Sequence, residues 1–86
     1  MSKTCGYTLD ETLNMVRHAE GFDQLFDVHQ QELLAAVRTK TLKGMELGPY
    51  FPLPVSNGPH ADFNAGRATY RVTMIRGTYV IKRMAF

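Results

Sequence analysis

The last twenty residues, 67–86, constrain the fold more than any other part of the chain. They read RATYRVTMIRGTYVIKRMAF, in which apolar and polar side chains alternate and β-branched and aromatic residues are frequent. This pattern is typical of β-strands. The pair Arg76-Gly77 divides the segment near its middle, and glycine readily adopts the positive φ that a two-residue turn requires. The sequence therefore predicts a C-terminal β-hairpin.

A turn at Arg76-Gly77 also predicts the register of the hairpin. Ile75 then pairs with Thr78, and the alternation of side chains divides the hairpin into two faces. One face is apolar apart from a single arginine and is expected to pack on the core; it comprises Ala68, Tyr70, Val72, Met74, Tyr79, Ile81, Arg83 and Ala85. The other face places Arg71 opposite Lys82, and like charges across a pair cost stability unless an anion lies between them. We therefore interpret the outer face as a candidate anion-binding surface.

The N-terminal half has the pattern of two helices. Residues 8–11, Thr-Leu-Asp-Glu, match a capping box, and apolar residues then recur at helical spacing up to Gly21, which fits the position just after a helix end. A second helix is predicted over about residues 23–43, because it opens with acidic residues and closes with basic ones, as the helix dipole favours. Residues 8–43 are therefore expected to form an αα-hairpin with a short joint at residues 20–22.

The segment between the helices and the hairpin has a different character. Residues 44–66 contain all four prolines of the chain, which excludes a continuous helix. Within it, residues 50–55 are strongly apolar and are expected to cover the core. The missing N–H groups of Pro52 and Pro54 point to one side, so this stretch permits an edge strand and forbids a central one. Residues 62–65 are expected to form one helical turn.

These elements predict a fold of the α+β class. Its N-terminal αα-hairpin packs on a small antiparallel sheet with a C-terminal basic β-hairpin. A chain of 86 residues with an ordinary composition is expected to form a single domain, residues 1–86. Cys5 is the only cysteine, and neither a secretory signal nor a long apolar segment is visible, so we expect a cytoplasmic protein without membrane contact.

Charge is distributed unevenly along the chain. Residues 1–32 hold six acidic and two basic residues, whereas the remainder is strongly basic, although the net charge is only +2. A basic region of this kind suggests an anionic partner, and nucleic acid or a nucleic-acid-handling complex is the first hypothesis. The residues expected to contact it are all basic: Arg67, Arg71, Arg76 and Lys82 of the hairpin, and Arg38, Lys40 and Lys43 near the end of the second helix.

Two known families share parts of this pattern. Helices followed by a basic hairpin resemble a winged-helix domain, with residues 67–86 as the wing. Residues 70–73, Tyr-Arg-Val-Thr, followed by Gly77, look like the aromatic-x-aliphatic-Thr…Gly run of such wings, and this resemblance implies nucleic-acid binding. Only residues 33–43 correspond to a recognition helix. The end of the chain is also similar to the RelE-type toxin ribonucleases, whose sheets often finish with a Tyr-Arg-aliphatic strand, a turn and an apolar strand.

No set of residues in the sequence indicates a particular reaction. The cysteine and the three histidines match no zinc-ligand spacing, and no phosphate-binding glycine loop is present, so we expect neither a metal nor another cofactor. We therefore predict a non-enzymatic binding protein. The alternative is an inhibitor or adaptor of the phage or mobile-element type that binds a host protein. A RelE-like ribonuclease, with His60 acting beside Arg71 or Arg83, is the third hypothesis. The oligomeric state is left open.

Overall fold

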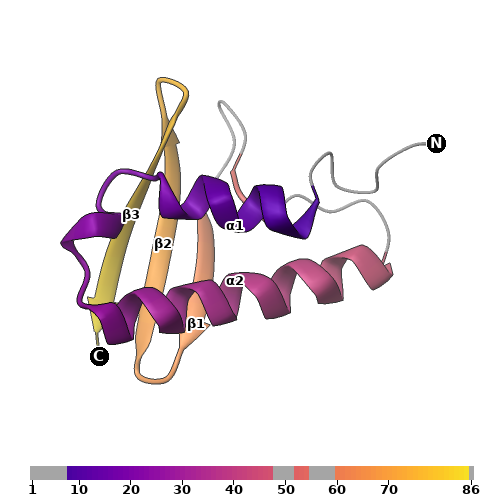
Figure 1. Ribbon diagram of the computed structural model, residues 1–86, viewed down its shortest axis with the longest axis horizontal. Helices are drawn as coiled ribbons and strands as arrows, with labels where there is room; N and C mark the ends of the chain where they lie inside the picture. The colour runs from indigo at the N-terminus through magenta and orange to yellow at the C-terminus, as the bar shows by residue number, and fades with distance from the viewer. Residues whose placement is uncertain (1–7, 48–51, 55–59, 86) are drawn as a thin grey trace.

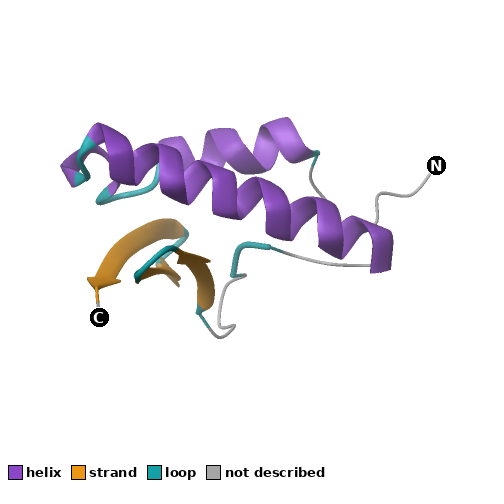
Figure 2. Cartoon of the chain, turned by 90° about the horizontal axis from the view of Figure 1, so that it is seen from below, coloured by secondary structure: helices purple, strands orange, loops and turns teal. Residues whose placement is uncertain are grey.

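Two helices pack on one face of a three-stranded antiparallel sheet. The computed structural model of the protein describes residues 8–47, 52–54 and 60–85. Helices α1 (Leu9–Arg17) and α2 (Asp27–Leu47) form one layer, and strands β1 (Ala61–Ala65), β2 (Ala68–Ile75) and β3 (Thr78–Ala85) form the other, in the order β1-β2-β3 (Figures 1 and 2). The predicted α+β class, with a helical pair on an antiparallel sheet, is confirmed.

The C-terminal hairpin has the predicted register. Ile75 pairs with Thr78, and Arg71 pairs with Lys82. Arg76 and Gly77 have φ values of 50° and 80°, as in the type I′ turns that match the twist of paired strands. The centre of the predicted core face is buried, at Ala68, Tyr70, Val72 and Ile81. Turn chemistry and side-chain alternation thus agree on one register.

Strand β1 replaces the helical turn that was predicted at residues 62–65. Asp62 pairs with Arg71 and Ala65 with Ala68, so β1 and β2 form a second hairpin. Its two-residue loop begins with Gly66, whose φ of 60° suits the first position of a type II′ turn. Phe63, between polar neighbours, is 1% exposed. The prediction was wrong because pairing with β2 satisfies the backbone and buries Phe63, which one isolated helical turn cannot do.

The helices begin and end at different residues from those predicted, although the first start is confirmed. The N–H group of Glu11 donates to Thr8 Oγ1 at 3.1 Å, and the N–H group of Thr8 donates to Glu11 Oε1 at 2.8 Å, which completes the capping box. Helix α1 nevertheless ends at Arg17, and α2 runs from Asp27 to Leu47 instead of from about residue 23 to 43. A 3₁₀ turn, η1 (Phe22–Gln24), lies between them. Phe26, which lies just before α2, is 75% exposed.

The helix connection is longer than predicted because it is hydrogen-bonded to β3. The N–H group of Glu20 donates to the Tyr79 carbonyl at 2.8 Å, and the N–H group of Ile81 donates to the Glu20 carbonyl at 2.8 Å. Gly21 follows with a φ of 94°, and a Cβ atom there would lie 2.6 Å from the Ile81 carbonyl oxygen. Both the positive φ and the close approach require glycine. Helix α1 therefore ends earlier than predicted, because the residues after it are bonded to the edge of the sheet.

Only part of the proline-rich segment falls within the described residues. Pro52, Leu53 and Pro54 are buried and have an irregular backbone. Leu53 belongs to the core formed by both helices and the sheet, as expected for a segment that covers the core. The rest of the edge strand allowed at residues 50–55 lies outside the described residues. No helix among the described residues is long and apolar enough to cross a membrane.

Candidate functional site

A groove runs between α2 and the outer edge of β1. It has a volume of about 560 Å³. Small side chains on this side of α2, such as Ala35 and Ala36, leave the space open. The groove is lined by residues of α2, of β1 and of the loop after β1: Glu32, Ala35, Ala36, Thr39, Lys40, Lys43, Asp62, Phe63, Asn64, Ala65 and Gly66.

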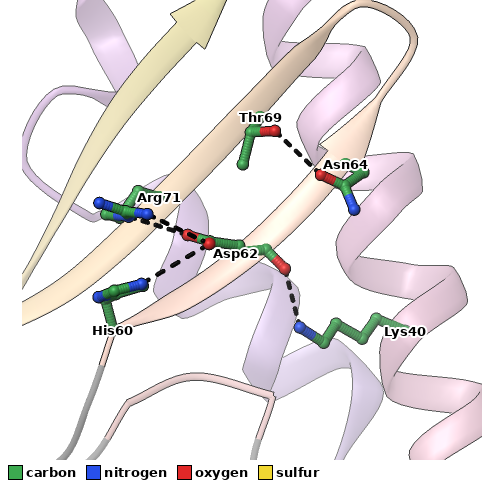
Figure 3. A network of polar contacts seen from close by, with 6 residues as sticks. All are labelled: Lys40, His60, Asp62, Asn64, Thr69 and Arg71. Atoms are coloured by element: carbon green, nitrogen blue, oxygen red, sulfur yellow. Dashed lines mark hydrogen bonds and ion pairs between the residues drawn. The ribbon is translucent and has the colours of Figure 1, made fainter.

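The β1 side of this groove is a strand edge. Ala65 and Ala68 flank a two-residue loop, so they form a hydrogen-bonded pair, and bonding alternates along the strand from there. Phe63 therefore directs its main-chain groups toward β2, whereas Asp62 and Asn64 direct theirs into the groove. The position of Lys40 agrees, because its Nζ donates to the Asp62 carbonyl at 2.8 Å (Figure 3). The ammonium group also lies 4.9 Å from the centroid of the Phe63 ring.

The side chain of Asp62 points to the open face of the sheet, where it meets the side chains of Arg71 and His60. Arg71 donates from Nε to Oδ1 at 3.0 Å and from Nη2 to Oδ2 at 3.4 Å. His60 Nε2 lies 3.6 Å from Oδ2 (Figure 3). The hydrogen bond from Arg71 lowers the pKa of Asp62, and the same bond raises the pKa of Arg71. Asp62 thus supplies a negative charge beside the Arg71–Lys82 pair, where the sequence suggested an external anion.

The other predicted basic residues are spread over the molecule. Lys40 and Lys43 line the groove, but Arg38 is two residues from Lys40, about 200° around the helix, and faces away from it. Arg67 and Arg76 occupy the two strand loops, which lie at opposite ends of the sheet (Figure 1).

Lys82 completes the predicted set. It is exposed on β3, opposite Arg71. The structure therefore brings only Lys40 and Lys43 of the seven residues together in the groove.

Glu32 marks the other end of the groove and is held in place there. The Tyr70 hydroxyl donates to Glu32 Oε1 at 3.0 Å and accepts from Arg83 Nε at 3.3 Å. Burial of Tyr70 raises the pKa of its hydroxyl, so this group remains a neutral donor. Glu32 Oε2 would lie 3.7 Å from a Cβ atom at Gly66. The groove is therefore acidic near the end of β1 and basic near its start.

Several residues of this site were not among the predicted ones, and the most informative of these are Glu32, Asp62 and Asn64. Asp62 and Asn64 alternate with the apolar Ala61, Phe63 and Ala65 immediately before the Gly66-Arg67 loop, and this alternation is the signal that a second hairpin was present. Within the described residues, no three metal-ligating side chains lie close enough together to hold an ion.

No family model, curated protein or solved structure matches this chain. The functional argument therefore rests on the geometry of the groove and its charges.

Proposed function

We propose that this protein is a small non-enzymatic binding protein, an inhibitor or adaptor whose partner is a protein segment held in the groove between α2 and β1. One observation carries the proposal. Main-chain groups of Asp62 and Asn64 point into the groove, and the small side chains of Ala35 and Ala36 face them across it. Exposed strand edges pair readily with other chains, and an adjoining helix provides side-chain contacts.

The distribution of charge favours a protein partner over nucleic acid. Nucleic-acid surfaces gather their phosphate-contacting cations along one face. Here Arg67 and Arg76 lie at opposite ends of the sheet, and Arg71 is bonded to Asp62. The groove itself combines Lys40 and Lys43 with acidic residues. A surface of mixed charge and small apolar side chains suits a peptide better than a phosphate backbone.

A selection with random short peptides displayed on phage tests this function. The enriched peptides should bind wild-type protein but lose at least about tenfold in affinity, or about 1.4 kcal/mol, with Ala35→Trp, because the indole fills the groove. Arg38→Trp is the matched control, since it adds the same ring to the same helix on the side away from the groove. Equal binding by both variants, or the absence of enriched peptides, would contradict the proposal.

Two further assays address the remaining hypotheses. Nucleic-acid binding that weakens steeply with salt, and whose salt dependence flattens in Lys82→Glu, would favour the nucleic-acid hypothesis. RNA cleavage lost in His60→Ala would favour a ribonuclease, since His60 lies beside Asp62 and near Arg71. We expect neither activity.

A further inference from the structure

We infer that the partner segment is extended and acidic, and that it joins the sheet as a fourth strand along the outer edge of β1. This inference rests on the proposed function and specifies how the groove is occupied and by what chemistry.

The main chain of β1 offers the bonds that an added strand requires. Asp62 and Asn64 each direct an N–H and a carbonyl group into the groove, because the residues between and beside them are bonded to β2. Within the part of the chain that the structure describes, the Asp62 carbonyl accepts a hydrogen bond there from the Lys40 ammonium. A strand lying ~4.8 Å from β1 would pair with these groups. The edge thus has the geometry of strand-addition sites.

The helix side of the groove limits which side chains fit. Every second side chain of an added strand would point toward α2, which presents Ala35, Ala36 and Thr39 there. These residues are short, and the groove volume of about 560 Å³ accommodates aliphatic or β-branched side chains against them. The intervening side chains would face the open side of the sheet, beside Asp62 and Asn64. An alternating apolar and polar segment meets both requirements.

Charged side chains make the two ends of the groove different, and this difference determines how a bound segment is oriented. Helix α2 crosses the strands (Figure 1), and two contacts fix its position on β1: Glu32 lies near Gly66 after β1, and Lys40 reaches Asp62 near its start. When an incoming N–H group replaces the Lys40 ammonium at the Asp62 carbonyl, that ammonium needs a new partner. A carboxylate on the added strand, near Lys40 and Lys43, supplies one, whereas Glu32 would repel it at the other end. The partner should therefore be acidic at the end nearest Asp62.

Lys40 has a second role in the free protein. A lysine placed over a strand edge discourages nonspecific pairing with other chains. Its bond to the Asp62 carbonyl uses a flexible side chain, which an incoming strand can displace without breaking the sheet. In the free protein, Lys40 thus discourages nonspecific strand pairing at this edge. A segment that carries a carboxylate can bind there, because the carboxylate offers the Lys40 ammonium a new partner.

Two substitutions at one position test strand addition. Asn64→Pro and Asn64→Ala both remove the amide side chain and its bond from Thr69, but only proline removes the N–H group that points into the groove. The enriched phage peptides should bind Asn64→Pro about tenfold more weakly than Asn64→Ala, as expected for a lost main-chain bond. Circular dichroism and thermal melts establish that both variants fold. In wild-type protein, peptide binding should slow hydrogen exchange of the Asn64 amide, a measurement that needs no variant.

The acidic character of the partner is tested by charge reversal on α2. The enriched peptides should carry Asp or Glu, and Lys43→Glu should weaken their binding about tenfold, as for loss of a close charge pair in a groove. Arg38→Glu makes the same charge change on the side of α2 away from the groove and should leave binding nearly unchanged. Enriched peptides without acidic residues, or equal effects of the two substitutions, would overturn the acidic assignment.

The remaining outcomes separate this inference from the function on which it rests. Suppose that peptides bind wild-type protein and that Ala35→Trp abolishes this binding. If the same peptides bind Asn64→Pro and Asn64→Ala equally well and do not protect the Asn64 amide from exchange, strand addition is wrong and the binding function stands. If no peptide is enriched, both fail. Sedimentation that shows a dimer abolished by Asn64→Pro would identify the occupant as a second copy of the chain and overturn the acidic partner.

Discussion

Among the residues that the structure describes, main-chain hydrogen bonds from the helix connection cover the outer edge of β3, whereas the outer edge of β1 is reached by the Lys40 side chain. On β3, Glu20 is bonded to both Tyr79 and Ile81. On β1, Lys40 is bonded to the Asp62 carbonyl. Breaking the first arrangement requires the connection between the helices to move, whereas breaking the second requires only a change of side-chain rotamer. The comparison teaches that the cover of the β3 edge is built into the main-chain fold, whereas the contact at the β1 edge is made by a side chain, which is the basis of the proposed binding site.

The strongest test of the covered edge concerns the side chain of Ile81. This residue is 6% exposed and packs in the core, so Ile81→Ala should destabilise the protein by roughly 2–5 kcal/mol in urea melts. Val80 lies on the opposite face and is half-buried. Val80→Ala should therefore cost much less, and a larger effect at Val80 would contradict the assignment of faces in β3.

The next effect is expected at Gly21, where the connection meets β3. Gly21→Ala should cost roughly 1–3 kcal/mol from its positive φ alone, and more because Cβ would lie 2.6 Å from the Ile81 carbonyl oxygen. Gly77→Ala is the matched control: φ is 80° there, but no atom lies within 4 Å of the added Cβ. Thermal melts of both variants measure the difference. Equal losses would mean that the close approach to β3 does not matter.

A smaller effect is expected when the lysine over β1 is removed. Lys40→Met keeps an apolar stem but removes the bond to the Asp62 carbonyl, which is worth about 1 kcal/mol. Chemical denaturation should therefore show a modest loss. If Lys40→Met lowers the free energy of unfolding as much as Gly21→Ala does, the contacts at the two edges contribute equally to stability. The contrast between the two edges would then be wrong.

The smallest effect is expected from the Asp62–Arg71 pair across β1 and β2. Because Arg71 holds the pKa of Asp62 below its usual value, the ionised carboxylate stabilises the folded protein at neutral pH. This contribution is lost as the pH falls through the lowered pKa, and partial exposure keeps it small. Thermal melts across the acidic range should show that Asp62→Asn destabilises at neutral pH and matches wild type at the lowest pH. A constant difference at all pH values would contradict this explanation.

Local signals in the sequence predicted several elements correctly. The Arg76-Gly77 turn and the alternation around it gave the register of β2 with β3, and the capping box gave the start of α1. The capping box and the turn each depend on residues that are close together in the chain. The alternation of side chains is repeated along a whole strand, so it can also be recognised without the tertiary structure. The α+β class followed from the same patterns, and among the candidate site residues Lys40 and Lys43 do lie together on the groove.

Tertiary contacts decided the rest. The end of α1 depends on the bonds between Glu20 and β3, and the identity of β1 depends on its pairing with β2. The partner of Arg71 is a carboxylate that joins it only when β1 and β2 are side by side. The groove exists because α2 packs against the edge of β1 through residues far apart in sequence. The sequence alone determined where strands and helices tend to form. Only packing decided how each edge of the sheet is contacted within the described residues, because that depends on which segments lie beside each edge in the fold.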